Sequence, residues 1–286
     1  MKAHAHEFPV AKMSEVLEVS RSGYYKWLAA GAPTSATKDD LDEQIEQAFN
    51  DSHQTYGSPR IAQYLRDKGT STSTSSVARR MQRLNIEARR PKKFVHTTDS
   101  DHDHPIAPNV LDRDFEAESA GLKWVSDLTY FKIGSIWYYL TIILDLADRS
   151  IVGWTISDNM TSEETTIAAL LVAVKNRKPQ PGMIFHSDRG VQYASAAFRE
   201  QLADLEAVQS MSGKGNCWDN AVAESFFKTI KTECINRHVF LSYDRAWSII
   251  FRYIEGWYNT KRIHTSLGGL TPLQAYEAKS KYELAA

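Results

Sequence analysis

From residue 122 onward the sequence changes from helical patterns to consecutive strand patterns, and this change constrains the fold more than any other feature. Trp124–Ile133 and Trp137–Leu146 are rich in aromatic and β-branched residues and are joined at Gly134-Ser135, which is typical of a β-hairpin. A turn at Asp148-Arg149 then leads to a third strand, Ile151–Ile156. The domain that follows residue 122 is therefore expected to begin with three antiparallel strands.

Helices and strands alternate after these three strands. The expected elements are the helix Thr161–Asn176, the strand Met183–Phe185, the helix Ser195–Leu205, the strand Ala207–Ser210 and the helix Asn220–Asn236. Three antiparallel strands followed by helix, strand, helix, strand and helix are the order of a ribonuclease-H-like α/β fold with a mixed sheet. Two further helices, Ser242–Thr260 and Pro272–Lys279, complete the pattern. The aromatic residues of the first are expected in the core rather than on a base-stacking surface.

Three acidic residues fall where a sheet of this kind places chemistry, at the ends of strands and on the helix beside them. Asp188 follows the strand Met183–Phe185, Asp127 ends the segment Trp124–Asp127, and Glu224 lies on the helix Asn220–Asn236. Carboxylates are ligands for hard divalent cations. Two such ions can activate an attacking hydroxyl and stabilise the leaving oxygen of a phosphodiester. We therefore expect Asp127, Asp188 and Glu224 to form one metal site.

Other polar residues near these positions have more than one interpretation. Lys228 and Lys231 follow Glu224 by four and seven residues, so they share its helix face and are candidates for DNA phosphate contacts. Asp145 lies on a strand and is expected to be structural. His186 precedes Asp188 by two residues and so lies on the same strand face. The His186 side chain is expected either to form a hydrogen bond near the site or simply to pack there.

The net charge of −1 conceals a strong segregation of charge. Residues 56–94 contain ten Lys or Arg against two acids, a net +8, whereas residues 99–118 contain seven acids against one Arg, a net −6. A basic module beside an acidic segment is typical of a polyanion-binding unit with a solvated tether. The histidines of this acidic segment are interpreted as part of the linker rather than as a metal site.

The basic module has a helix–turn–helix pattern formed by Ser58–Lys68 and Ser75–Leu84. Arginines off the buried face of the second helix suit entry into a DNA groove, and a basic tail supplies further phosphate contacts. These candidates are Arg79, Arg80 and Arg83 on the helix, and Arg89, Arg90, Lys92 and Lys93 in the tail. A plain helical hairpin is the alternative. Upstream, Val10–Ala30 predicts two short helices, either a DNA-binding pair or a docking hairpin, and Leu41–Asn50 predicts an acidic helix.

Composition excludes several classes of protein. Two cysteines, Cys217 and Cys234, support neither a disulfide framework nor a zinc knuckle and suit a reducing compartment. No apolar run reaches the roughly 18 residues of a membrane span, and the N-terminus lacks the apolar segment of a secretory signal. We expect a cytoplasmic protein without a membrane partner.

Three motifs carry a resemblance to a known family. They are Trp124–Tyr130, His186–Tyr193 and Gly215–Lys228. With Tyr258-Asn259, Arg262, His264, Leu267-Gly268 and Thr271-Pro272, the sequence resembles transposases of the IS-three group of bacterial insertion elements, which are related to retroviral integrases. The resemblance extends from about residue 56 to residue 276 and is specific.

The resemblance implies an Asp-Asp-Glu strand-transfer site at Asp127, Asp188 and Glu224 that uses magnesium or manganese. It also implies that Lys231 contacts DNA near the cut, and that element ends are joined through a circular intermediate before insertion into target DNA. Partners are then the element ends and target DNA, with a homo-oligomer expected on the DNA. No sustained heptad is present, so the chain resembles the second reading frame of a fusion whose upstream frame supplies a DNA-binding partner.

Taken together, the sequence predicts four regions: an N-terminal helical segment at 1–50, a basic helix–turn–helix-like domain at 51–95, an acidic linker at 96–118, and an integrase-type catalytic core with C-terminal helices at 119–280. The predicted function is metal-dependent DNA cleavage and strand transfer. A ribonuclease-H-like nuclease without strand transfer and a non-catalytic DNA-binding regulator built on Tyr56–Lys93 are the alternatives.

Overall fold

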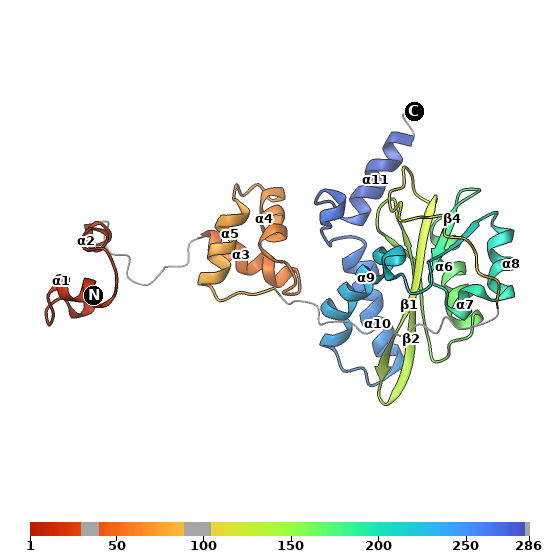
Figure 1. The fold of residues 1–286 in the computed structure, drawn as a ribbon, viewed down its shortest axis with the longest axis horizontal. Coiled ribbons are helices and arrows are strands. Elements are labelled where there is room, and N and C mark those ends of the chain that lie inside the picture. Colours follow the sequence, from red (N-terminus) through yellow and green to blue (C-terminus); the bar gives the residue numbers. More distant parts are fainter. Residues whose placement is uncertain (30–39, 89–103, 284–286) are drawn as a thin grey trace. The chain divides into compact units, whose positions relative to one another are not determined.

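The computed structural model describes residues 1–29, 40–88 and 104–283 (Figure 1). The basic tail with Arg89, Arg90, Lys92 and Lys93 lies outside the described residues. The chain forms two compact units, residues 1–46 and residues 47–286. Within the described helices, none combines the length and the apolar character needed to cross a bilayer.

The first unit is helical, as the sequence predicts. It contains the 3-10 turn η1 (Lys2–His4), α1 (Val10–Val16) and α2 (Arg21–Ala29). The hydroxyl of Ser20 accepts a hydrogen bond from the backbone N–H of Gly23 at 3.0 Å, which caps the start of α2. Helix α3 (Asp40–Asp51) begins in the first unit and ends in the second.

A helix–turn–helix opens the second unit. It is formed by α4 (Ser58–Asp67) and α5 (Thr74–Arg83), which confirms the predicted helical pair. Pro59 lies in the first turn of α4, where its missing N–H has no cost. Gly69 follows α4 with a φ of +88°, a left-handed conformation that glycine adopts without strain. The hydroxyl of Ser73 caps α5 by accepting the N–H of Ser76 at 3.1 Å.

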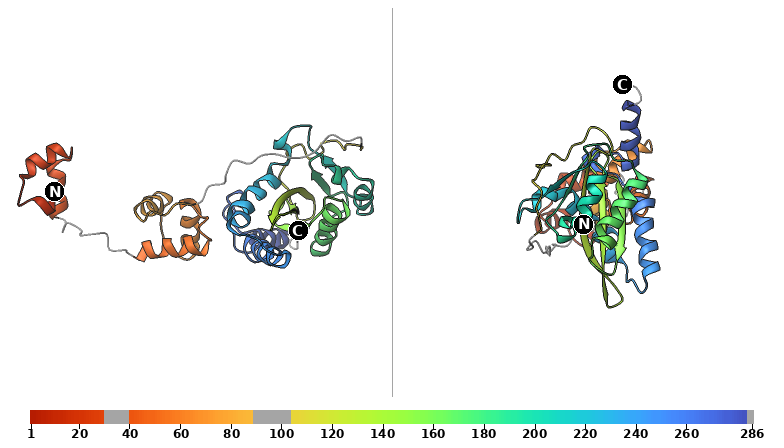
Figure 2. Two further views of the ribbon diagram at one scale, coloured as in Figure 1. Left: turned by 90° about the horizontal axis from the view of Figure 1, so that it is seen from below. Right: turned by 90° about the vertical axis from the view of Figure 1, so that its right-hand side faces the viewer.

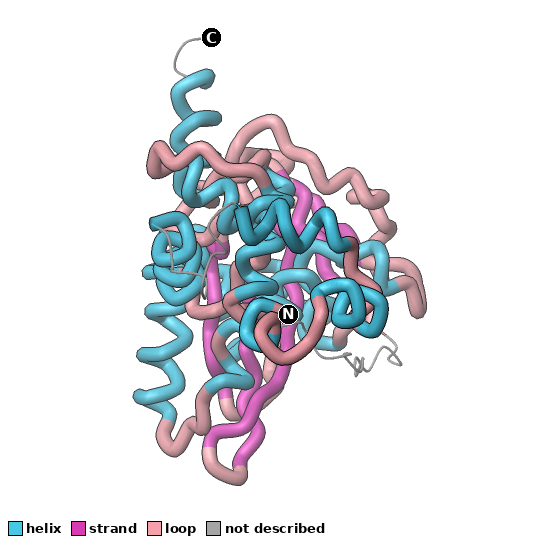
Figure 3. The backbone as a smooth tube through the Cα atoms, turned by 90° about the vertical axis from the view of Figure 1, so that its left-hand side faces the viewer, coloured by secondary structure: helices cyan, strands magenta, loops and turns pink. Residues whose placement is uncertain are grey.

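The remaining part of this unit is built on a five-stranded mixed sheet with the order β3-β2-β1-β4-β5. Its strands are β1 (Lys123–Ile133), β2 (Ile136–Asp145), β3 (Ile151–Ser157), β4 (Ile184–Ser187) and β5 (Val208–Met211). β2 pairs antiparallel with β1 and β3, whereas β4 pairs parallel with β1 and β5. This is the predicted ribonuclease-H-like sheet. Its β1–β2 hairpin extends past the shorter strands (Figure 3).

Helices cover both faces of the sheet (Figure 2). One face carries the π-helical turn η2 (Glu163–Ile167), α6 (Ala168–Asn176), α7 (Val191–Ala194) and α8 (Ala196–Asp204), and the other carries α9 (Ala221–Glu233) and α10 (Tyr243–Tyr253). Successive β2 residues supply the two cores, since Ile142 packs on the α9 side and Ile143 on the α6 side. Burial on both faces explains the continuous apolar run of this strand.

The C-terminal part consists of short turns and a last helix. The π-helical turn η5 (Ile254–Tyr258) extends α10, and the 3-10 turn η6 (Thr265–Leu267) precedes α11 (Pro272–Glu283). Ile250, Ile254 and Tyr258 are buried in the core, as expected. The core prediction is wrong for Trp247 and Phe251, which are each 42% exposed and stack on one another with ring centroids 5.0 Å apart.

Candidate active site

Strand register brings Asp127 and Asp188 to neighbouring positions. Val125 and His186 are Cα partners in the parallel pair β1–β4, and the two aspartates follow them by two residues each. Adjacent strands lie about 4.8 Å apart. Asp188 follows the last residue of β4, as predicted, but the prediction that Asp127 ends its strand is wrong. β1 continues past Asp127 because its far half pairs with β2 in the hairpin.

Backbone N–H groups hold both aspartate side chains. The N–H of Gly190 donates to Asp188 Oδ1 at 2.9 Å, and the N–H of Leu128 donates to Asp127 Oδ1 at 2.8 Å. A Cβ at position 190 would lie 3.0 Å from Asp188 Oδ1, so glycine gives the carboxylate its space there. Both aspartates are intermediate in exposure, neither fully buried nor fully exposed.

Glu224 and the two lysines lie along α9. Glu224 is in the first turn of the helix with its side chain 17% exposed, and its Oε2 lies 3.8 Å from Lys228 Nζ. Lys228 is exposed, whereas Lys231 is half-buried with its Nζ 5.3 Å from the ring centroid of Tyr130 on β1. The predicted stripe of one acid and two cations on this helix is therefore present.

Electrostatics link the three carboxylates. Burial raises the pKa of Asp127 well above its ordinary value, and the negative charges of Asp188 and Glu224 raise it further, while Lys231 opposes them. Burial also lowers the pKa of the Lys231 ammonium, and Asp127 acts against that shift. Mutual repulsion of this kind arises when acids converge on one place.

Two residues that support the site were not identified from the sequence. The side-chain amide of Asn220 donates to the backbone carbonyl of Ser126 at 2.9 Å, which attaches the start of α9 to β1 beside Asp127. The Ser126 hydroxyl lies 2.8 Å from the Tyr193 hydroxyl. Tyr193 is buried, and burial together with Asp127 and Asp188 raises its pKa well above the ordinary value. Both residues lie inside the motifs that carry the resemblance, and their pairing is long-range.

The loop before α9 is fixed by another acid. Asp219 lies in the 3-10 turn η3 (Cys217–Asn220) and accepts hydrogen bonds from the N–H of Gly213 at 2.9 Å and from Nε of Arg113 at 2.8 Å. The loop thus connects the end of β5 to the first turn of α9 with defined anchors. These hydrogen bonds help to set the position of Glu224.

His186 and Asp145 have structural contacts. The buried His186 ring lies 2.8 Å from the Ser210 hydroxyl through Nδ1 and 3.1 Å from the Ser212 hydroxyl through Nε2, and burial lowers its pKa to about 4. Its hydrogen bonds therefore connect β4 to β5. Asp145 is fully buried, accepts the Trp124 Nε1 hydrogen at 2.9 Å and lies 3.0 Å from Arg177 Nη1. Its structural interpretation agrees with these contacts.

The carboxylate oxygens of this site are suitable ligands for a hard divalent cation, but the three side chains are not drawn together around a single point. In the part of the chain that the structure describes, no three His, Cys, Asp or Glu side chains are grouped tightly enough to hold an ion together. Asp127 and Asp188 are set by backbone register, whereas Glu224 leans toward Lys228 on its own helix. Carboxylate oxygens are nevertheless the ligands that magnesium and manganese prefer.

The DNA-contact candidates on the helix–turn–helix lie on α5. Arg79 and Arg83 are exposed and Arg80 is half-buried, while Val77 and Met81 of the same helix are buried. The arginines therefore project away from the face that packs on α4.

Three segments of the chain match known protein families. Residues 117–217 and 206–272 each match an integrase core domain, and residues 37–94 match an HTH-like domain.

Two proteins of bacterial insertion elements are similar over nearly the whole chain. Transposase InsF for insertion sequence IS3A of Escherichia coli (strain K12) is 37% identical over 277 residues, covering 96% of each chain. A 31 kDa protein of the insertion element IS600 of Shigella sonnei is 37% identical over 261 residues, covering 91% of this chain and 96% of that protein.

Solved viral integrases show a weaker likeness at 19% identity. A simian T-cell lymphotropic virus intasome in complex with PP2A regulatory subunit B56 gamma gives a TM-score of 0.48 over 82% of this chain and 74% of that chain. The HTLV-2 integrase catalytic core domain in complex with magnesium gives a TM-score of 0.43 over 55% of this chain and 97% of that chain.

Proposed function

Because this chain belongs to the InsF transposase family of IS3 insertion sequences, we propose that Asp127, Asp188 and Glu224 are the carboxylates at which it cuts and joins DNA. The activity is transposition, a polynucleotidyl transfer in which DNA is cleaved and its strands are transferred by an integrase core. The proposal concerns which residues perform this chemistry.

One observation carries the assignment: the parallel register of β1 and β4 sets Asp127 beside Asp188. Burial, together with the charges of Asp188 and Glu224, accordingly raises the pKa of Asp127. Two strands and one helix therefore direct negative charge to one region of the surface. Magnesium or manganese is the cation that this oxygen donor set would hold, and it would supply charge stabilisation for the attacking and leaving oxygens of the phosphodiester. Rotation of the long Glu224 side chain away from Lys228 would complete the group.

The protein's own residues supply the remaining functions. Lys228 and Lys231 place positive charge on the helix that carries Glu224, where it attracts a DNA phosphate. Asn220 and Tyr193 hold Ser126, the neighbour of Asp127, and so orient the first carboxylate. We assign them positioning roles.

DNA is the substrate, and the HTH-like domain is its proposed anchor. Arg79, Arg80 and Arg83 project from α5 with the charge and placement of groove- or phosphate-contacting residues. Two element ends and one target DNA have to be brought together in the reaction, and we propose that copies of the chain assemble on DNA to do so. An upstream-frame protein, free or fused, is proposed as a further partner.

Substitution of Glu224 by Gln tests the assignment. The variant keeps the size of the side chain but loses its charge, so metal-dependent cleavage and joining of element ends should be abolished while DNA binding stays near that of the natural chain. Glu200→Gln on the exposed face of α8 is the matched control and should cleave and join normally.

The product distinguishes the alternatives. Joined strands are expected from a transposase, whereas nicks without joined product would favour the nuclease. Binding that survives deletion of everything after Glu118, without any metal-dependent cleavage by the full chain, would favour the regulator. Joining retained by Glu224→Gln would contradict the proposed site.

A further inference from the structure

We propose that residues 52–60, which lead into the HTH-like helices, form a docking segment that binds the C-terminal end of the catalytic helix α9 and holds the helix–turn–helix in a fixed position relative to Glu224. Docking itself is a structural claim, and its effect on catalysis rests on the function proposed above. Neither the family matches nor the carboxylate site assigns such a role to these residues.

The receiving surface is a buried ion pair at the last residue of α9. Glu233 accepts hydrogen bonds from Arg262 Nε at 2.9 Å through Oε2 and from Arg262 Nη2 at 2.7 Å through Oε1. The Tyr253 hydroxyl of α10 donates to Oε2 at 2.8 Å. Both charged side chains are only 6% exposed. A buried carboxylate with this many donors is fixed in orientation.

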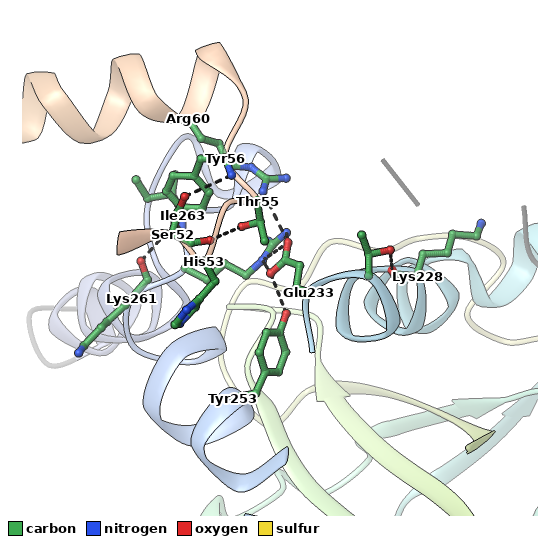
Figure 4. A network of polar contacts seen from close by, with 12 residues as sticks. Ser52, His53, Thr55, Tyr56, Arg60, Lys228, Glu233, Tyr253, Lys261 and Ile263 are labelled. Atoms are coloured by element: carbon green, nitrogen blue, oxygen red, sulfur yellow. Dashed lines mark hydrogen bonds and ion pairs between the residues drawn. The ribbon is translucent and has the colours of Figure 1, made fainter. Parts of the chain in front are cut away.

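The docking segment adds groups to this ion pair (Figure 4). Tyr56 is 1% exposed, and its hydroxyl accepts the backbone N–H of Ile263 at 2.7 Å, next to Arg262. Arg60, in the first turn of α4, places Nη1 3.9 Å from Glu233 Oε1, and its guanidinium lies 5.5 Å from the Tyr56 ring centroid. The same carboxylate is thus flanked by arginines from both sides of the junction.

A second set of contacts lies beside the first. The backbone carbonyl of His53 accepts a hydrogen bond from Arg237, which follows α9 in the 3-10 turn η4 (Ile235–Arg237). The His53 ring meets Trp257 edge-on at a centroid distance of 4.9 Å, and the Tyr56 ring lies 5.9 Å from the same indole. The docking segment therefore contacts Glu233 at the end of α9 through Arg60, and the residues packed around that end through His53 and Tyr56.

The junction shares its helix with the candidate active site. Glu224 occupies the first turn of α9 and Glu233 its last position. A helix–turn–helix docked at Glu233 is therefore held at a set distance and orientation from the Glu224 carboxylate. DNA bound on α5 would then reach the carboxylates in a defined orientation, which is how positioning contributes to rate. We accordingly assign Tyr56 and Arg60 positioning roles.

Docking is tested first without DNA or metal, by hydrogen exchange of the Ile263 amide in the full chain. Tyr56→Phe removes only the hydroxyl that accepts this amide, and exchange at Ile263 should become at least about tenfold faster. Tyr64→Phe is the control, because its hydroxyl bonds Asp51 at 2.9 Å within the same domain and should leave Ile263 protected. Equal exchange rates in all three proteins would overturn the docking.

The catalytic consequence is tested by measuring DNA binding and strand joining separately. Tyr56→Phe should bind terminal-repeat DNA within about twofold of the natural chain but join it at least about tenfold more slowly. Unchanged joining, or a loss in joining equal to the loss in binding, would overturn the positioning role.

A second pair of variants tests the positioning role at another residue of the docking segment. Arg60→Ala should repeat the separation of binding from joining, whereas Arg66→Ala, which removes the same charge from an exposed position of α4, should not. If Arg66→Ala slowed joining equally, general charge loss would explain the effect and the proposal would fail. If Glu224→Gln still joined DNA, the proposed carboxylates would fail, while the exchange experiment would still decide the docking.

Discussion

Asp127 and Asp188 are placed side by side by the parallel register of β1 and β4, in which Val125 pairs with His186 two residues before each aspartate. Two acids fixed by backbone hydrogen bonding cannot move apart as two flexible side chains would. Their repulsion is therefore built into the fold. It should affect the stability of the protein, the dependence of that stability on pH, and metal binding.

Substituting Asp127 by Asn should change how stability depends on pH. The folded state raises the pKa of Asp127, so it binds the proton more tightly than the unfolded chain does. The resulting stabilisation is present below the ordinary aspartate pKa and is lost as pH rises through the raised value. Above that range, without divalent cations, Asp127→Asn should be more stable than the natural chain by on the order of 1 kcal/mol. Urea unfolding in chelator across pH measures this difference.

Addition of magnesium should reverse the ranking, because the cation stabilises only the natural carboxylate set. A difference in stability that stays constant across pH, or that ignores magnesium, would contradict the electrostatic account of this aspartate.

Substituting Glu233 by Gln should destabilise the protein strongly. Arg262 would keep its charge in a buried position without a carboxylate partner, and breaking such a pair typically costs about 3–5 kcal/mol. Lys228→Ala, which removes a half-exposed pair at 3.8 Å, should cost no more than about 1 kcal/mol. Urea denaturation at neutral pH compares the two variants, and similar small losses for both would show that the buried pair is not a structural anchor.

Replacing Arg79, Arg80 and Arg83 together by Ala should weaken DNA binding and flatten its salt dependence. Each arginine that contacts a phosphate contributes about 0.9 to the slope of log K against log salt. A double substitution of Lys12 and Lys26 by Ala in the first unit serves as the comparison and also tests whether α1 and α2 bind DNA. Binding titrations across salt concentrations give the slopes, and an unchanged slope in the triple variant would remove α5 from the DNA interface.

Substituting Asn220 by Ala should slow cleavage by about 10–100-fold with little change in DNA affinity. The change removes the bond between Asn220 Nδ2 and the Ser126 carbonyl, so the first turn of α9 loses its attachment beside Asp127. Displacements of about 1 Å can cost roughly that much rate. Asn236→Ala, at an exposed position after α9, is the control. Single-turnover cleavage on saturating DNA separates rate from binding, and equal rates in both variants would argue against this positioning role.

Local sequence patterns predicted most of the fold. The hairpin at Gly134, the apolar run of β2 and the position of Asp188 after β4 all follow from local residue patterns and turn residues, which act over a few residues. The position of Asp127 within its strand was not predicted correctly. β1 stops pairing with β4 just before Asp127 but continues beyond it in the antiparallel pairing with β2. The pattern of β1 alone does not contain that information.

Long-range pairings and exposed aromatics could not be predicted in the same way. The bond from Asn220 to Ser126 joins residues 94 positions apart, and Glu233 meets Arg262 across 29 positions, so both depend on how complete elements pack. On α10 the helical spacing predicted one buried stripe. It could not specify that Trp247 and Phe251 lie at the uncovered edge of that stripe.

The uninterrupted course of α9 determines where the chain tolerates changes in length. Glu224 and Glu233 are nine residues apart (233 − 224), and each residue added to an α-helix turns it by about 100° and lengthens it by about 1.5 Å. One inserted or deleted residue between them would therefore rotate the carboxylate away from β1 or the ion pair away from Arg262. We expect a single-residue insertion or deletion inside residues 225–232 to eliminate transposition.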